Sequence, residues 1–424
     1  MGGFDSLFGV AKFLMSSTNE KINTLNKGIS ECGQVYAHNL MQNAFQINTI
    51  ISGTSQYIRN ILIKNQVKLA LDSGIPAVML HSYNLQLANE IFQLVGGRNA
   101  TMVDSNSANF SPFLGLQDYE AIDIIMESIP EKYDVKQDAR YYLEAISDLM
   151  QANRIAASFN NYLTCPHDTV LDRIDNLVLS GKITDSDAQA MRSKIMAGQS
   201  EYYKIDSFLR SLNKQMGNAS RHKNSTSQPV SIYKSVESNG FIAIDVGPSF
   251  NSIYVDFLIE LLKMAIQKGK PFLLVLDSIE LRENKKVKDV IIGGNGHSTT
   301  VVSCDDLLSS CGGNSELFAS VVASAKQYMV FSHPSAISAS QWASVIGEYE
   351  RIDESHSKST SRTDDGMGFW SMNVDNYTQK SRTVSTSKRR DFIIPPEKIV
   401  TMQNNEFFMK SETFKGIKHG YVTN

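Results

Sequence analysis

A carboxylate at the end of an apolar run is the first candidate for chemistry. Asp277 directly follows Phe272–Leu276, a run without a polar break that is typical of a strand buried on both faces of a parallel sheet. We therefore expect Asp277 at the carboxyl edge of a central strand, where open α/β sheets bind ligands and an Asp can hold a magnesium ion. The alternative is that Asp277 caps the turn or helix that follows.

The second candidate is a turn of small residues between a strand-like run and a helical pattern. Ser52-Gly53-Thr54-Ser55 follows Gln46–Ile51 and precedes the helical pattern of Gln56–Leu71. Strand, turn and helix in this order are typical of a phosphate-binding loop. The four turn residues, with Arg59 as a nearby cation, are candidate phosphate ligands, and Ser55 and Asp277 are candidate magnesium ligands.

Basic residues suggest a possible nucleic-acid contact. Lys285, Lys286 and Lys288 could join Lys388, Arg389 and Arg390 in a strip that binds DNA phosphates. The alternative is that both groups are ordinary solvated charges. A helix is predicted over Ser338–Tyr349. The charged residues near its end, Glu348, Glu350 and Arg351, could meet a neighbouring subunit in a ring or simply form an exposed helix surface.

Composition limits the class of protein. The chain has 424 residues, 42% of them hydrophobic, and a net charge of -3, which argues against a strongly basic nucleic-acid clamp. Its four cysteines are scattered without zinc spacing, as in reduced cytoplasmic proteins. No run approaches the roughly 18 apolar residues of a membrane span, so we expect a cytoplasmic protein, with peripheral contact at the inner face of a membrane as an option.

Strand and helix patterns alternate in both halves of the chain, which predicts an α/β core with a parallel sheet. Between the halves, repeated 3.6-residue patterns predict an all-helical insertion. The expected units are N-terminal helices (1–45), the first part of the α/β domain (46–115), the helical domain (116–228), the second part of the α/β domain (229–352), a Ser/Thr-rich loop or hairpin (353–388) and C-terminal strands (389–424).

The second half resembles the nucleotide-hydrolase domain of type IV secretion coupling proteins, the conjugation ATPases of the TraG/TraD kind. The likeness rests on the strand ending at Asp277, the strand Met329–Ser332 before His333, the basic pair Arg389-Arg390 and the turn Ile394–Ile399. These features cover about 150 residues, and the first half follows the same family only in the order of its elements. The resemblance implies a RecA-like P-loop fold, with ATP and magnesium as cofactors.

Two parts of the family's hydrolytic apparatus differ here. The family's phosphate loop has the pattern GxxxxGK[ST], whereas the segment Ser52–Asn60 has one glycine and no lysine. The residue after the strand-ending acid, commonly a Glu that polarises water, is Ser278, and Glu280 would point to the same side as Ser278 if the strand continued. By resemblance, His333 could sense the γ-phosphate, although a histidine satisfied by the backbone is an equal alternative.

The sequence therefore predicts a coupling-protein-like component of a conjugative DNA-transfer or type IV secretion apparatus, with a weak or inactive nucleotide site. Its expected partners are apparatus proteins, with DNA and a homo-oligomeric ring as options. The first alternative is an active DNA-translocating motor that uses Asp277, Glu280 and His333 in catalysis. The second is a cytosolic scaffold unrelated to transfer.

Overall fold

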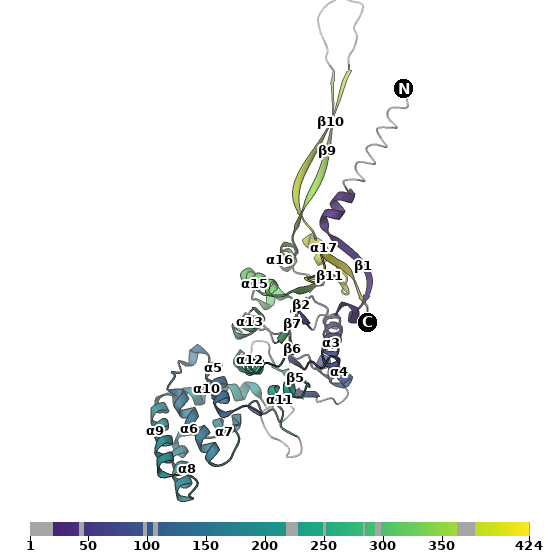
Figure 1. The fold of residues 1–424 in the computed structure, drawn as a ribbon. Helices are drawn as coiled ribbons and strands as arrows, with labels where there is room; N and C mark the ends of the chain where they lie inside the picture. The colour runs from purple at the N-terminus through teal and green to yellow at the C-terminus, as the bar shows by residue number, and fades with distance from the viewer. Residues whose placement is uncertain are drawn as a thin grey trace, which may run out of the picture.

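The chain forms a ten-stranded, mostly parallel sheet covered by helices on both faces (Figure 1). The structure is a computed structural model that describes residues 20–41, 46–95, 100–104, 109–217, 228–248, 252–282, 285–292, 298–362 and 378–423. The strand order is β1-β12-β11-β8-β2-β7-β6-β3-β5-β4. The strands are β1 (Ile29–Tyr36), β2 (Thr49–Ser52), β3 (Ala77–His81), β4 (Ala100–Val103), β5 (Phe241–Asp245), β6 (Phe272–Asp277), β7 (Ser298–Cys304), β8 (Gln327–Val330), β11 (Glu406–Ser411) and β12 (Ile417–Thr423). The predicted α/β fold class is confirmed.

The central strands bury both of their faces. In β6, Leu273 and Val275 pack towards helices α3 (Gln56–Asp72) and α4 (Leu85–Val95), while Leu274 and Leu276 pack towards the opposite helical layer. That layer consists of α12 (Ser252–Gln267), α13 (Lys285–Ile292), α15 (Ser315–Ser324) and α16 (Ala336–Ile346). Because successive side chains of a strand point to opposite faces, an unbroken apolar run is what such a strand requires.

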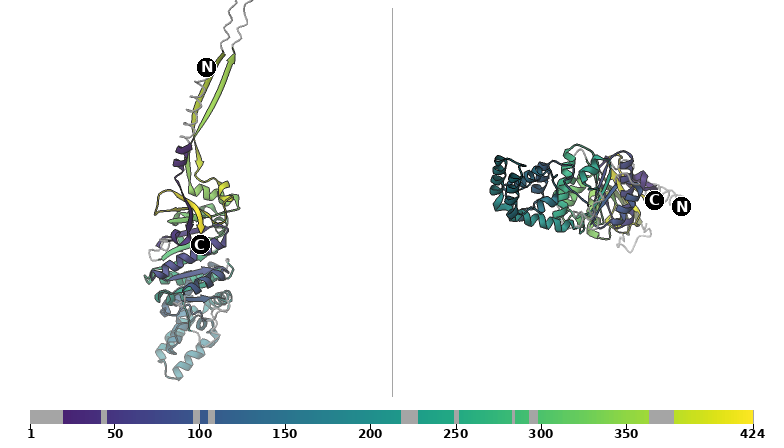
Figure 2. Two further views of the ribbon diagram at one scale, coloured as in Figure 1. Left: turned by 90° about the vertical axis from the view of Figure 1, so that its right-hand side faces the viewer. Right: turned by 90° about the horizontal axis from the view of Figure 1, so that it is seen from below.

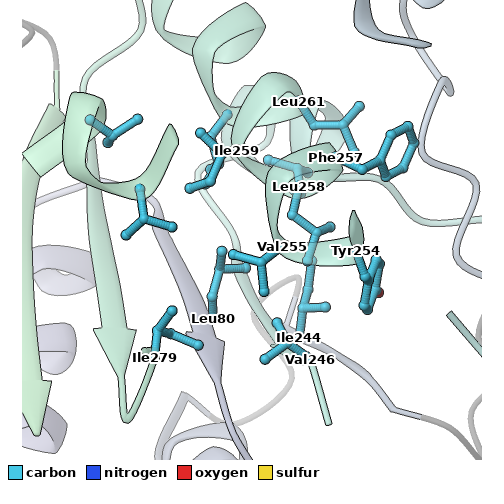
Figure 3. Close-up of a cluster of buried hydrophobic side chains, with 14 of the residues drawn as sticks. Leu80, Ile244, Val246, Tyr254, Val255, Phe257, Leu258, Ile259, Leu261 and Ile279 are labelled. Carbon is cyan, nitrogen blue, oxygen red and sulfur yellow. The ribbon is translucent and has the colours of Figure 1, made fainter. Parts of the chain in front are cut away.

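Helix α12 is central to this layer. Figure 3 shows Val255, Leu258 and Ile259 of α12 directed towards Leu80 of β3 and Ile244 of β5. All five side chains are fully buried. The contact fixes α12 against the carboxyl half of β3 and β5.

The helical insertion lies between β4 and β5 in the chain. It comprises α5 (Asp118–Ser128), α6 (Ala139–Ala152), α7 (Phe159–Leu163), α8 (His167–Leu179), α9 (Asp185–Gly198) and α10 (Tyr202–Met216), with the short helices η2 (Glu131–Tyr133) and η3 (Gln199–Glu201). Figure 2, viewed from below, shows this block beside the sheet. A short helix, α11 (Ile232–Glu237), leads back into β5. Within the described parts of the chain, no helix is long and apolar enough to cross a membrane.

The N-terminal region departs from the prediction of helices over 1–45. Residues 29–36 form β1, which pairs in parallel with β12 near the other end of the chain. His419 of β12 bridges Glu31 of β1 and Glu406 of β11, with nitrogen–oxygen distances of 2.6 and 2.8 Å. Most of β1 is exposed, so it has no apolar alternation by which the sequence could predict a strand. Residues 1–19 lie outside the described residues.

The Ser/Thr-rich segment forms an antiparallel hairpin of β9 (Glu348–Arg362) and β10 (Thr378–Phe392), which projects from the sheet domain (Figures 1 and 2). The prediction of a helix up to Tyr349 is wrong. Helix α16 ends at Ile346 because Gly347, with φ of 115°, turns the chain into β9. Glu348, Glu350 and Arg351 are therefore strand residues, and residues 363–377 lie outside the described residues.

Candidate functional site

The turn after β2 consists of only Gly53, Thr54 and Ser55 before α3 begins. The amide of Gly53 donates to the carbonyl of Cys304 at 3.1 Å, and the amide of Thr54 donates to the carbonyl of Ser332 at 3.2 Å. The hydrogen-bond ladder of the sheet thus extends into the turn on both sides. Phosphate-wrapping loops instead point such amides at the anion.

Arg59 lies beneath this turn on the first turns of α3. Its side chain is 2% exposed, and its guanidinium forms an ion pair with Asp305 and donates to the carbonyl of Gly53. Gly53 itself is packed against Phe331, because an added Cβ would lie 2.3 Å from the Phe331 Cβ. Arg59, the predicted cationic phosphate ligand, is therefore already paired within the protein.

Asp277 is fully buried at the end of β6. Its Oδ2 accepts from Asn84 Nδ2 at 2.7 Å, and its Oδ1 accepts from the Ser303 hydroxyl at 2.6 Å. Asn84 also donates to Asn60 Oδ1 at 2.9 Å, which connects Asp277 to α3. The turn after β2 and Asp277 accordingly lie at the same edge of one sheet, with β7 between their strands.

Glu280 does not continue the alternation of β6. The strand ends at Asp277, and Ser278 takes a left-handed conformation with φ of 59°. Because the strand does not continue to Glu280, the prediction that Glu280 and Ser278 point to the same side of a strand does not apply. Glu280 lies half-buried in the turn that follows.

His333 lies on the other side of β2 from Asp277, after β8. It is fully buried, its Nε2 is 3.3 Å from the Ser52 hydroxyl, and its ring stacks on Trp342. Burial lowers the pKa of His333 to about 4 against the attraction of Asp306, so the ring is neutral at pH 7. The strand between β2 and β6 is β7, which ends at Cys304, and Asp305 follows it directly as a charged residue between the two candidate segments.

Several residues of this edge had no signal in the sequence. Asn60, Asn84, Ser303 and Asp305 are common residue types, and each meets its partner across a large sequence separation. A polar residue directly after a buried strand is a cue that could have indicated Asp305, whereas Ser303 lies within β7.

The residues present can be compared with the needs of magnesium and a triphosphate. Such a site needs free amides, a free cation for phosphate and free carboxylate or hydroxyl oxygens for the metal. Here two turn amides, the Arg59 guanidinium and both Asp277 oxygens already have protein partners. In the described chain no three His, Cys, Asp or Glu side chains gather in a metal-binding group. The arrangement as it stands does not fit magnesium and a triphosphate.

The predicted basic strip is not one surface. Lys286 of α13 forms an ion pair with Glu260 at 2.7 Å, and Arg389 of β10 pairs with Asp353 at 2.9 Å. In Figure 1, α13 is separated from the hairpin by α15 and α16. Lys288 lies with Lys286 on α13, Arg390 lies exposed on β10, and the side chain of Lys285 is outside the described residues.

The sheet order, the helices on its two faces and the helical insertion define a RecA-like, P-loop-type fold of the kind found in type IV coupling proteins. The solved structures with this fold include the bacterial conjugative coupling protein TrwB in an unbound form, which has a TM-score of 0.52 and 11% sequence identity over 92% of this chain and 91% of that chain. TrwB in complex with ADP and Mg²⁺ matches with a TM-score of 0.51 and 12% identity over 93% and 90%. At the level of sequence, no family model and no curated protein matches the chain.

Proposed function

We propose that this chain is a coupling-protein-like component of a conjugative DNA-transfer or type IV secretion apparatus that works by binding and not by nucleotide hydrolysis. The fold, shared with TrwB over nine-tenths of both chains, supports the type of protein. The candidate phosphate and magnesium ligands, Arg59 and Asp277, already have protein partners, which supports the absence of nucleotide hydrolysis. In this proposal the helical domain and the sheet domain provide surfaces for cargo and for other apparatus proteins.

One observation carries the proposal: the Arg59 guanidinium is paired with Asp305 and the Gly53 carbonyl inside the turn that would hold phosphate. To bind a triphosphate, the protein would first have to break this ion pair and free the amides of Gly53 and Thr54. A phosphate would replace the Asp305 carboxylate and the Gly53 carbonyl as partners of this buried guanidinium, so the new contact would be gained only at the loss of the existing ones. Arg59 is also a planar fork and not the compact charge that a phosphate loop uses.

The test adds increasing ATP, together with Mg²⁺, to the protein and measures its melting temperature at each concentration. Phosphate release is then measured in the presence and absence of DNA. A ligand at a hundred times its dissociation constant would add about 2.7 kcal/mol to the free energy of unfolding. We expect no shift and no release. A saturable rise in melting temperature that disappears in Asp277→Ala would contradict the proposal.

The second candidate function is an ATP-driven motor with Asp277 on magnesium and Arg59 on phosphate. It is favoured by one observation, that a solved structure of TrwB with the same fold holds ADP and Mg²⁺. The experiment above separates the two, because a motor must release phosphate and must do so faster when DNA is present.

A further inference from the structure

The hairpin of β9 and β10 is a ribbon of two strands, to which no third strand of the described chain is added. The strands pair from Thr378 with Arg362 to Phe392 with Glu348, and the ribbon projects away from the body of the molecule (Figures 1 and 2). Such a hairpin is only marginally stable alone in water, and its outer edges present unpaired backbone N–H and C=O groups. The ribbon can therefore accept an added strand.

A short stretch of the outer edge of β9 is already covered from within the chain. Asn23 Nδ2 donates to the carbonyl of Ile352 at 3.1 Å, and Asn23 Oδ1 accepts from the Ile352 amide at 3.0 Å. Asn26 Nδ2 donates to the carbonyl of Glu350 at 3.3 Å. Asn23 thus bonds to β9 as the peptide group of a neighbouring strand would. The same bonds show that the backbone groups of Ile352 point outward, and so do those of its register partner Lys388.

The outer edge of β10 is the open edge. Because the direction of the backbone groups alternates along a strand, the even-numbered residues from 380 to 388 all direct their N–H and C=O groups outward. Within the described chain, no strand pairs with this edge and none of these groups bonds to a backbone outside the ribbon. Residues 385–390 are exposed. The edge of β10 therefore offers a row of main-chain donors and acceptors.

The even positions of β10 also hold most of its positive charge. Residues at every second position share one face of a ribbon, and on β10 this face has no acidic residue and four basic ones, Lys380, Arg382, Lys388 and Arg390. On the other face Arg389 is paired with Asp353 at 2.9 Å. Lys388 is paired with Glu350 at 3.0 Å, but both side chains are more than half exposed, so this pair contributes little. The even face is the one with unmatched positive charge.

The charge and the backbone together decide which occupant fits this edge. The β10 strand of a second copy would bring the same basic face alongside, and like charges on neighbouring strands are destabilising. A nucleic acid has no peptide groups with which to continue the ladder. An extended protein segment with an acidic residue at every second position pairs its main chain with the edge and places its carboxylates beside the basic face.

We propose that the outer edge of β10 binds, by strand addition, an extended segment of a partner protein in which acidic residues recur at every second position. The inference goes beyond the proposed function, because it makes the hairpin a docking surface and specifies the residue pattern of the segment that docks there. It does not depend on the state of the nucleotide site.

The first test measures the affinity of the full chain for a fluorescent twelve-residue peptide of alternating Thr and Glu by anisotropy. The matched control peptide has the same composition, with six Thr followed by six Glu. We expect the alternating peptide to bind more tightly, because only its glutamates all lie on one face of an added strand. Hydrogen exchange should slow in β10 when the alternating peptide is bound.

A variant of constant composition tests the face. Lys380→Ser/Ser381→Lys/Arg382→Thr/Thr383→Arg moves two charges to the other face of the ribbon, so that no register of the peptide matches all four basic residues. Loss of two opposite-charge pairs across strands should weaken binding of the alternating peptide about twofold to thirtyfold. The net charge is unchanged, so attraction to charge alone predicts no effect.

A proline on each edge tests the strand addition. Thr386→Pro removes an outward N–H of β10 that β9 does not use, which a strand tolerates on its outer edge, and it should weaken binding at an unchanged melting temperature. Thr360→Pro, the matched control, makes the same change on the outer edge of β9 and should leave the affinity unchanged.

Several results would overturn the inference. These are the absence of saturable binding of the alternating peptide, equal affinity for the two peptides, or unchanged affinity in either the charge-exchange variant or Thr386→Pro. Displacement of the peptide by an equal concentration of single-stranded DNA would assign the basic face to nucleic acid and would also overturn it. An ATP-dependent stabilisation lost in Asp277→Ala would count only against the proposed function.

Discussion

Asp277 is the residue whose replacement should separate a structural role from a role in metal binding. Its carboxylate accepts from Ser303 at 2.6 Å and from Asn84 at 2.7 Å, and all three residues are at most 2% exposed. Asp277→Ala would leave two buried donors without their acceptor. A hydrogen bond to a charged group is worth about 1.5–3 kcal/mol, so we expect a loss of about 3–6 kcal/mol in the free energy of unfolding.

Ser303→Ala is the clean partner for a double-mutant cycle, because Asn84 also caps α4 through the amide of Leu87. The single Ser303→Ala change should cost about 1.5–3 kcal/mol, and the double variant should cost less than the sum of the two. Asp172→Ala, at an exposed position in the middle of α8, is the matched control and should change the free energy of unfolding by less than about 0.5 kcal/mol.

The assay is equilibrium urea denaturation followed by the fluorescence of Trp342, which is fully buried against Phe318 and Tyr328, in a Trp370→Phe background. A change in stability appears as a shift of the midpoint at constant slope. Two results would refute the Asn84–Asp277–Ser303 hydrogen-bond network. One is that the losses of unfolding free energy in Asp277→Ala and Ser303→Ala simply add in the double variant, and the other is a loss below about 1 kcal/mol for Asp277→Ala alone. A stabilisation by Mg²⁺ alone that Asp277→Ala removes would also refute it.

Two further predictions concern the same sheet edge. His333 has a folded pKa of about 4, below its value of about 6.5 in the unfolded chain, so its contribution to stability is complete above pH 6.5 and is lost as the pH falls towards 4. The melting temperature should therefore fall less between pH 7.5 and pH 5 in His333→Gln than in the parent chain, and an equal fall in both would be contrary to this assignment. Gly53→Ala would place a methyl group 2.3 Å from the Cβ of Phe331 and should lower the melting temperature markedly, whereas Gly74→Ala, with open space around it, should cost only about 1 kcal/mol; equal effects would mean that the packing at Gly53 is not limiting.

The sequence predicts those parts of the fold whose side chains carry a period. The run ending at Asp277 is β6, the 3.6-residue patterns are the helical insertion, and the predicted terminal strands are β11 and β12. The edge strand β1 escapes prediction because an exposed strand that pairs on one side places few constraints on its side chains. The start of β9 could not be predicted from the sequence, because the residues after Gly347 suit a helix surface and a strand equally well.

The chemistry of the site is less predictable than its position. That the turn after β2 and Asp277 share one sheet edge follows from the order of the strands and helices. That Arg59 pairs with Asp305, 246 positions along the chain, does not, because an arginine three residues into a helix has the same local pattern whether it faces a ligand or the protein. Pairing between distant segments depends on which strand lies next to β2, and here that strand is β7.

The Arg59 pair explains how such a turn can stay ordered without an anion. In a phosphate-binding loop the amides converge on the ligand, and an empty loop leaves those donors to water. In this chain the first two amides of the turn bind the neighbouring strands, and the guanidinium binds the Gly53 carbonyl from below. A turn whose first two amides and nearby cation already have protein partners can therefore keep its conformation without an anion.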